Sequence, residues 1–236
     1  MIPRWFTKFR IAAALTLASA CLIATSGCDP RTMLYFLQPF EPTIAAHGPK
    51  LENKKVVILC YATSGALGEF PSIERDITRE VASRLRAKVK KITIVDPDKT
   101  ATWMEAHPRN TDPAEVANDF DADIVILLEI EQFRTQAPGD LNVVHGDSKT
   151  HIKVFEMQYP KNSKDKPIKD QPKEAKDIYD EYAESNFPNR GPLPIDTGSS
   201  LGAFKNKLTK IVATEITWHF VGHSEEDVIQ DSRIER

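Results

Sequence analysis

The chain has 236 residues, and its 31 lysines and arginines against 34 aspartates and glutamates give a formal net charge of −3. Apolar residues make up 41% and charged residues 28%, a globular balance that excludes a disordered, collagenous or polytopic membrane protein. Charges of both signs are interspersed along the chain, which excludes nucleic acid as the main partner because phosphate binding needs a concentrated basic face. Three cysteines are too few for a disulfide-stapled scaffold.

The N-terminal segment has the pattern of an export signal. Residues 1–10 carry three basic residues and no acid, and residues 11–27 are apolar or small. This order is typical of a secretory signal or a short membrane anchor. The segment ends in Ser26-Gly27-Cys28, which resembles the end of a bacterial lipoprotein signal peptide.

We therefore predict a signal peptide over 1–27 and a lipid anchor (palmitate) on Cys28. The acylated Cys28 is expected to hold the chain on a bilayer of the cell envelope, facing the periplasm or the exterior. Thr25 departs from the usual leucine of such signals, so the cleavage position stays open, and Cys21 is a second candidate. The alternative is an uncleaved N-terminal helix, which also places the rest of the chain outside the cytoplasm.

The remaining chain is predicted to hold one folded domain behind a tether. Residues 28–53 contain four prolines and no sustained period, which is typical of a linker. A single α/β domain is expected over 54–223, with a mobile excursion at 160–198, where lysine, acidic residues and proline dominate. Residues 224–236 are expected to form a charged tail.

The elements of the domain follow from hydrophobic periodicity and helix-capping signals. Residues 63–71 are expected to be a loop, and the excursion is expected to carry one irregular strand around Ile178 and Tyr182. Strands are predicted at 56–60, 92–95, 124–130 and 151–159, and helices at 73–85, 97–107, 113–120 and from Ser199 or Ser200 to near Gly222.

This order of elements predicts an α/β fold with a mixed sheet of about four to five strands and helices packed on it. The first three strands are joined by helices and are therefore expected to be parallel. The third and fourth are joined by a helix-free segment around Gly139 and Gly146, so they are expected to be antiparallel.

Several of these segments resemble one group of envelope lipoproteins. The strand at 54–59, the helix at 73–85, the segment 94–96 and the run 122–126 are similar to those of the curli-secretion lipoprotein, the activators of penicillin-binding proteins and the N-terminal domain of the Tol translocation protein. The resemblance implies an α/β fold and an envelope location. Glu129 departs from the group's pattern, which often has glycine at that point.

A ligand cleft is predicted where the strands end. Gly65 and Gly68 follow the first strand, Asp96 follows the second, and Glu129 lies in the third. Open α/β sheets bind small molecules beyond the carboxyl ends of their strands. The glycine spacing is not that of a nucleotide-binding loop, so a plain connecting loop is the alternative.

Three residues on the last helix have a spacing that suits a metal ion. Glu215, His219 and His223 are four residues apart, which puts them on one helical stripe. Histidines in a last helical turn also complement the negative end of the helix dipole, and this is the favoured interpretation. We expect no metal and no other cofactor.

The leading functional hypothesis is a non-catalytic, lipid-anchored envelope protein whose α/β domain binds another envelope protein as an accessory or scaffold factor. The first alternative is a small-molecule-binding or sensory periplasmic domain that uses the predicted cleft. The second is a metal-dependent enzyme built on the last helix.

Overall fold

A computed structural model of the chain groups Thr43–Arg236 into one compact unit. Cys28, the signal peptide predicted over 1–27 and the tail after Ser224 lie outside the described residues. The structure describes residues 43–108, 112–137, 140–162, 167–168, 170–189, 191–194 and 201–224.

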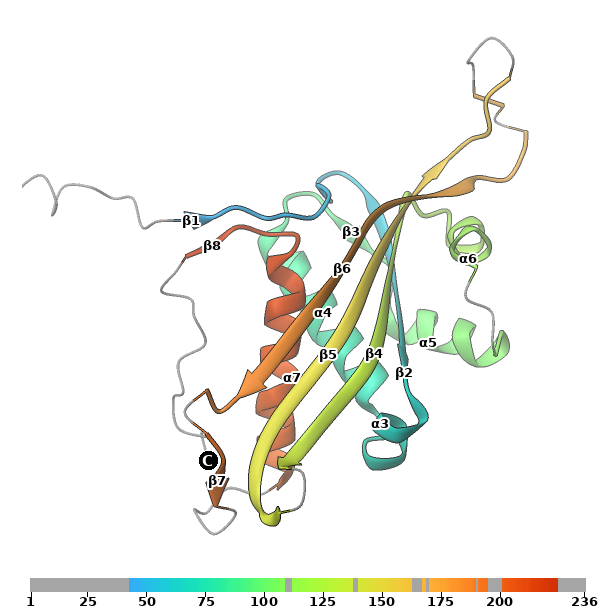
Figure 1. Cartoon of the computed structure of the whole chain (residues 1–236). Helices are drawn as coiled ribbons and strands as arrows, with labels where there is room; N and C mark the ends of the chain where they lie inside the picture. The colour runs from blue at the N-terminus through green and yellow to red at the C-terminus, as the bar shows by residue number, and fades with distance from the viewer. Residues whose placement is uncertain are drawn as a thin grey trace, which may run out of the picture. The chain divides into compact units, whose positions relative to one another are not determined.

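A six-stranded mixed sheet forms the centre of this unit (Figure 1). Five strands follow the order β3-β2-β4-β5-β6, and β7 pairs with β5. β2 is parallel to β3 and β4, whereas β4, β5 and β6 are antiparallel, so the predicted fold class is confirmed. The strands are β2 (Lys55–Ala62), β3 (Thr93–Ile94), β4 (Ile124–Ala137), β5 (Asp140–Gln158), β6 (Glu174–Phe187) and β7 (Leu193–Pro194).

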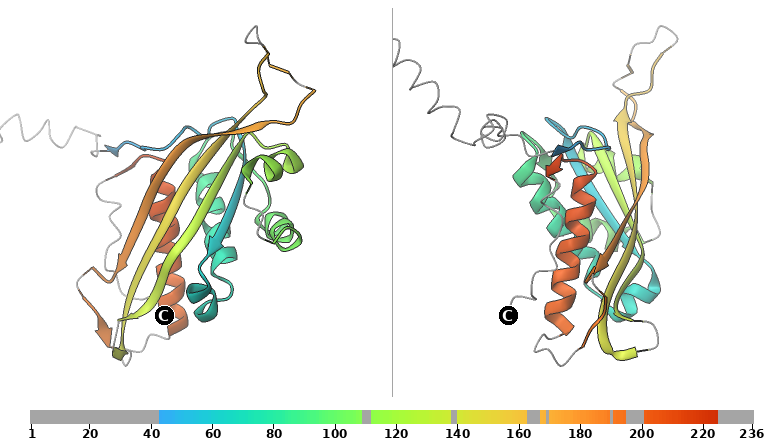
Figure 2. Two further views of the ribbon diagram at one scale, coloured as in Figure 1. Left: turned by 45° about the vertical axis from the view of Figure 1, so that its right-hand side comes forward. Right: turned by 60° about the vertical axis from the view of Figure 1, so that its left-hand side comes forward.

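Helices lie on both faces of the parallel part of the sheet (Figure 2). α4 and α7 pack on one face, where they bury Ile77 and Leu208 against Ile58. α5 and α6 pack on the other face, where Trp103 and Val116 share a core with Val57. The helices are α3 (Ser64–Glu69), α4 (Ile73–Lys88), α5 (Pro97–Ala106), α6 (Pro113–Phe120) and α7 (Leu201–Trp218).

Two helices begin as their capping signals predict. The Asp96 carboxylate accepts a hydrogen bond from the backbone N–H of Asp98, and that of Asp112 accepts one from Ala114. A proline follows each cap, where its missing N–H has no intrahelical partner to lose. Ser72 is the N-cap residue of α4, but its hydroxyl donates to the Asp76 carboxylate and not to the helix backbone.

Two segments expected to be irregular form regular structure. Most of the loop expected at 63–71 is the short helix α3, which closes over the end of β4 through an edge-to-face contact between Phe70 and Phe133. The excursion expected at 160–198 contains β6, a 14-residue strand paired with β5 along its length. The pairing satisfies the backbone, so the charged composition of the strand does not prevent it from forming.

The unit also begins earlier than the predicted boundary at residue 54. β1 (Thr43–Ile44) pairs with β8 (His223–Ser224) in a two-stranded sheet. The backbone N–H of Gly48 donates to the carbonyl of His219 at 2.6 Å. Residues 43–53, which the sequence placed in the linker, therefore pack against the end of α7.

Gly146 lies inside β5 and not in a turn. A Cβ atom at this position would lie 2.8 Å from Cδ2 of Leu208 on α7, so glycine allows α7 to approach the strand closely. None of the helices that the structure describes is long and apolar enough to cross a bilayer.

Candidate functional site

On the face of the antiparallel strands opposite α7, α5 and α6 cover only the end where β4 begins, and no helix in the described part of the chain covers the rest. Figure 1 shows β4, β5 and β6 in front of α4 and α7, with α5 and α6 to the side. Along β4, the residues on this open face change from Val125 and Leu127, which pack in the core with α5 and α6, to Glu129 and Glu131. The face changes from apolar to polar where the helical cover ends.

The open face carries a cluster of interacting side chains around His151. The strand register places Glu129 and Tyr182 on either side of His151. Nδ1 of His151 lies 3.2 Å from the Glu129 carboxylate, and Nε2 contacts the Asp180 carboxylate. Lys153 donates a 3.0 Å hydrogen bond to Glu129. The side chain of His151 is only 12% exposed, so its neighbours hold it in one orientation.

Tyr182 is the large aromatic residue of this cluster. Its ring stacks on His151 with 4.3 Å between centroids and 9° between planes, and Nζ of Lys149 lies 4.4 Å from its centroid. Its hydroxyl donates to Glu131 at 3.3 Å. Tyr182 nevertheless remains 44% exposed, so it is restrained by its neighbours and still open to a partner. We call these residues the His151–Tyr182 cluster: Glu129, Glu131, Lys149, His151, Lys153, Asp180 and Tyr182.

The ion pairs of this cluster stabilise the fold little, because solvent screens most of its charges. The hydrogen bond from Lys153 to Glu129 raises the pKa of that lysine, and the charges of Glu129 and Asp180 act in the same direction. The lysine therefore stays charged throughout the neutral range. The cluster presents a stable pattern of mixed charge around one aromatic ring.

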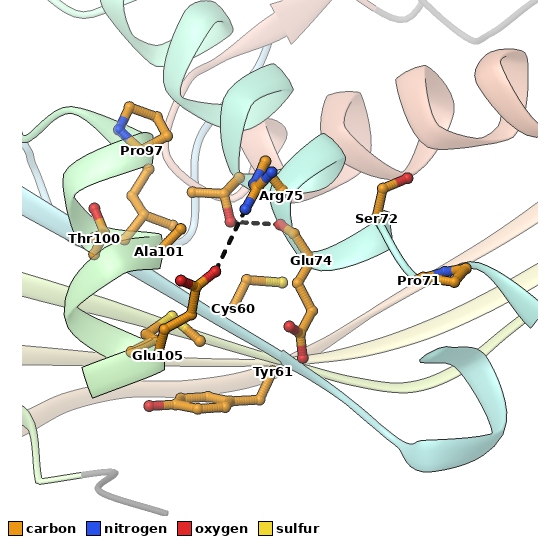
Figure 3. Close-up of a pocket in the computed structure, with 13 residues that line it drawn as sticks. Cys60, Tyr61, Pro71, Ser72, Glu74, Arg75, Pro97, Thr100, Ala101 and Glu105 are labelled. Carbon is orange, nitrogen blue, oxygen red and sulfur yellow. Dashed lines mark hydrogen bonds and ion pairs between the residues drawn. The ribbon is translucent and has the colours of Figure 1, made fainter. Parts of the chain in front are cut away.

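A pocket of about 420 Å³ opens beside β2 (Figure 3). The first two turns of α4 form one wall and α5 forms the other, and an ion pair of 3.5 Å between Arg75 and Glu105 joins them. The Glu74 carboxylate accepts a 2.7 Å hydrogen bond from the backbone N–H of Ala62. Burial raises the pKa of Glu74, and this hydrogen bond opposes the rise.

The thiol of Cys60 lines the same pocket but is not a candidate nucleophile. Cys60 is buried, as its apolar surroundings in the sequence predict. Burial, followed by the charge of Glu74, strongly raises the pKa of the thiol. A reactive cysteine needs an electropositive site that stabilises its thiolate, so Cys60 is a small apolar core residue.

The four residues of the predicted cleft do not come together. Gly65 and Gly68 are exposed in α3, with open space where a Cβ would lie. The Asp96 carboxylate caps α5, and that of Glu129 belongs to the His151–Tyr182 cluster. The sequence predicted a loop open to ligands after β2, but α3 forms there, and none of the four residues lines the pocket beside β2.

The three predicted metal-ligand candidates, in contrast, line one pocket. Glu215, His219 and His223 surround a pocket of about 280 Å³ at the end of α7, and His47 approaches it from the N-terminal segment. The Ser185 hydroxyl donates to the Glu215 carboxylate.

The three candidate side chains contact three different partners. Nδ1 of His219 lies 2.6 Å from the hydroxyl of Tyr179, and the ring of His223 stacks on Trp218. Burial raises the pKa of Glu215 to about 7 and lowers the pKa of His219. No group of three or more histidine, cysteine or acidic residues in the described part of the chain is arranged to hold a metal ion.

The sequence prediction named Tyr182 as part of an irregular strand but not as a site residue. Buried Ala183, Ser185 and Phe187 alternate with exposed residues there. That alternation is a strand signal. The pairing of Tyr182 with His151, however, depends on the register between β5 and β6, which a single sequence does not specify.

The chain is similar to known proteins in structure but not in sequence. The chain matches no protein-family model, and no curated protein is similar to it in sequence.

Several solved structures are similar over most of their length. A variant PelC dodecamer from Paraburkholderia phytofirmans is 14% identical, with a TM-score of 0.39 over 76% of this chain and 98% of the other. The lipoprotein GNA1162 from Neisseria meningitidis is 11% identical, with a TM-score of 0.39 over 71% and 98%. A putative neuraminyllactose-binding hemagglutinin homolog from Helicobacter pylori is 12% identical, with a TM-score of 0.33 over 74% and 86%.

Proposed function

We propose that this chain is a lipid-anchored protein of the bacterial cell envelope whose α/β domain binds another protein as a non-catalytic accessory factor. Cys28 is the lipid-bearing residue of this proposal, and the open face of β4, β5 and β6 is the binding surface. The anchor is supported by the basic, apolar and small-residue order of residues 1–28.

The observation that carries the binding role is the pre-organised His151–Tyr182 cluster. Tyrosine is among the residues that contribute most to protein interfaces, because it buries a large ring and keeps a polar hydroxyl. Stacking on His151 and the hydrogen bond to Glu131 already restrain Tyr182. A partner therefore binds with little further loss of side-chain entropy.

Charge makes this surface selective. Four acidic residues surround the tyrosine, two lysines pair with some of them, and His151 lies between two carboxylates. The acidic residues are Glu129, Glu131, Asp180 and Glu184. A partner with a basic or mixed-charge surface around an apolar recess complements this pattern, and such complementarity acts on specificity and association rate.

The tether allows the domain to reach such a partner near the bilayer. Fourteen residues lie between Cys28 and Thr43, where the described domain begins. A fully extended chain spans at most about 3.5 Å per residue, so the domain works within roughly 50 Å of the bilayer surface.

The anchor is tested by fractionation and by mass. The full-length chain is expected to sediment with membranes and to carry a lipid mass on its N-terminal cysteine, whereas Cys28→Ala is expected to lose the lipid. Cys21→Ala is the matched control and is expected to remain acylated. A wild-type chain that carries no lipid contradicts the anchor.

The binding surface is tested by site-specific cross-linking in cells. A photoreactive phenylalanine analogue in place of Tyr182 is expected to cross-link to one discrete envelope protein. The same analogue at Tyr159, a tyrosine of similar exposure at the end of β5, is the control and is expected not to cross-link to that protein. Equal cross-linking from both positions contradicts the proposed surface.

A further inference from the structure

On the side of the 420 Å³ pocket, six of the eight residues of β2 have no neighbouring strand among the described residues. β3 is only two residues long and pairs with Lys55 and Val56. Beyond Val56, no strand in the described part of the chain lies on this side of β2. On the other side, β4 pairs with β2 from Val56 through Ala62.

The direction of the unpaired backbone groups follows from the bonds that are made. In a parallel sheet, alternate residues of a strand direct their N–H and C=O groups to opposite neighbours. The carbonyls of Lys54 and Val56 accept hydrogen bonds from the segment containing β3, whereas Thr63 donates to a carbonyl of β4. By this alternation, Ile58 and Cys60 direct their N–H and C=O groups toward β3 and hence into the pocket, which both residues line.

Ile58 and Cys60 are buried residues, so hydrogen bonds to their unpaired backbone groups would be stabilising. Ile58 is 2% exposed and Cys60 is 1% exposed. A buried backbone group without a hydrogen bond costs roughly 1–3 kcal/mol, so most such groups in folded proteins are paired. The next residue in the same row, Ala62, has its N–H bound to the Glu74 carboxylate, which marks the end of the unpaired stretch.

The sequence explains why β3 stops early. One residue separates β3 from Asp96, whose side chain caps α5, and the helix begins at Pro97. α5 then runs past the β2 edge and forms the far wall of the pocket. Because α5 begins so soon, β3 is short and leaves part of the β2 edge uncovered. We call the resulting space the slot: the β2 edge is its floor, and α4 and α5 are its walls.

We propose that this slot binds a short extended segment of a partner protein, which adds to the sheet as a strand beside β2 and bonds to the backbone of Ile58 and Cys60. This inference rests on the proposed protein-binding function, but it names a different surface and a different mode of recognition. Only a peptide backbone presents donors and acceptors in alternation at the spacing of a strand.

The walls define which segment fits. A strand rises about 3.3 Å per residue, so the four-residue step from Ile58 to Ala62 covers roughly 13 Å and accommodates three to five residues. Ala101 and Met104 supply apolar lining, while the charges of Arg75 and Glu105 neutralise each other. The slot therefore selects small or apolar side chains, and proline is excluded where an N–H must bond.

The proposal is tested by selecting peptides that bind to the full-length protein. A library of random seven-residue peptides is panned on the full-length chain in detergent, and affinities of the selected peptides are measured with variants. Ala101→Phe places a ring in the slot and is expected to weaken binding at least tenfold. Ala106→Phe, at an exposed position of the same helix, is the matched control and is expected to leave binding unchanged.

A second measurement needs no variant and reports on the backbone bonds. Hydrogen exchange at the amides of Ile58 and Cys60 is expected to slow at least tenfold when a selected peptide binds. The amides of Val57 and Leu59, which face β4, are expected to change little. Peptides that bind without protecting Ile58 and Cys60 overturn the proposal, and so does a library from which no peptide sensitive to Ala101→Phe emerges.

This result is separable from the test of the proposed function. A chain that is acylated on Cys28 and cross-links through Tyr182, but whose slot binds no peptide, overturns only the slot. A chain whose slot binds peptides but which carries no lipid and cross-links nothing through Tyr182 overturns the proposed function and leaves the slot as a peptide site.

Discussion

The two halves of the sheet differ in how many of their faces are covered by helices. The parallel half, β3, β2 and β4, has helices on both faces, and Val56 through Cys60 are buried. The antiparallel half, β4, β5 and β6, is covered by α7 on one face, while α5 and α6 reach only one end of its other face. In the parallel half, the polar groups without a covering element are backbone groups at the β2 edge. In the antiparallel half, they are the side chains of the His151–Tyr182 cluster on the open face.

This difference follows from the connections between strands. Parallel neighbours need crossover helices, which cover the sheet and demand apolar residues on both faces. Antiparallel neighbours need only turns, so one face stays open and its residues are free to be polar. The four predictions below test this comparison, from the largest expected effect to the smallest.

The largest contrast in stability is expected between a core residue and an open-face residue. Leu128 of β4 is fully buried, so Leu128→Ala is expected to lower the free energy of unfolding by about 2–5 kcal/mol. Tyr182→Ala on the open face is expected to cost less than about 1 kcal/mol, as substitutions at exposed positions usually do. Urea denaturation measures both, and similar costs would contradict the assignment of Tyr182 to binding rather than to folding.

The pocket at the end of α7 predicts a pH dependence of stability. Burial raises the pKa of Glu215 from 4.5 to about 7. The folded state therefore keeps a proton that the unfolded state loses, and stability falls as the pH rises from 4.5 to 7. Glu215→Gln is expected to remove this decline, which a shift of this size puts on the order of 3 kcal/mol.

The control for this prediction is Glu184→Gln, an exposed residue of β6 that lines the same pocket. It is expected to leave the pH profile unchanged. His219 acts in the opposite direction, because burial lowers its pKa and acidification below 6.5 then costs stability. Both variants keep His219, so its contribution cancels. Parallel profiles for Glu215→Gln and the unsubstituted chain contradict the prediction.

Two glycine substitutions are expected to have opposite signs. Gly146→Ala places a Cβ 2.8 Å from a δ carbon of Leu208, which is fully buried in the core. The expected cost is about 1–3 kcal/mol. Gly65→Ala in exposed α3 meets no atom within 4 Å and is expected to stabilise by about 0.5–1 kcal/mol.

A second substitution tests whether the cost of Gly146→Ala comes from its contact with Leu208. Leu208→Val in the Gly146→Ala background is expected to recover part of the loss, because the shorter side chain makes room for the new methyl group. A double-mutant cycle measured by thermal unfolding shows whether the two residues interact. Additive effects would mean that Gly146 is not required for the approach of α7.

The smallest effect is expected at the residue that ends β3. Asp96→Ala removes the N-cap of α5 and is expected to cost about 1 kcal/mol, whereas Asp96→Asn keeps the hydrogen bond to the N–H of Asp98 and is expected to cost less. Chemical denaturation measures both. Equal stability of the two variants would contradict a capping role for Asp96.

The elements best predicted from the sequence are those with strong local signals. The caps at Asp96 and Asp112 and the start of the apolar strand at Ile124 were correctly placed because short-range chemistry specifies them, although β4 extends to Ala137. The loop expected at 63–71 was wrong, since α3 forms there and is followed by Phe70, which contacts Phe133 in the distant strand β4. The irregular strand expected around Ile178 and Tyr182 is in fact the regular 14-residue strand β6, because it pairs with β5 along its length.

The candidate sites were less predictable than the elements. Glu215, His219 and His223 share a pocket as their helical spacing suggested. The four residues predicted to form a cleft do not share a site. Gly65 and Gly68 lie in α3, Asp96 caps α5, and Glu129 belongs to the His151–Tyr182 cluster on the open face.

By itself, the sequence determined the alternation of strands and helices, the mixed sheet and the motif at Cys28, because each depends on side chains close together in the chain. Only the tertiary structure decided that His151 meets Tyr182 and that β2 has an unpaired edge beyond Val56. Register and strand neighbours are set by the packing of distant segments, and a single residue of slip would turn every side chain of a strand to the other face.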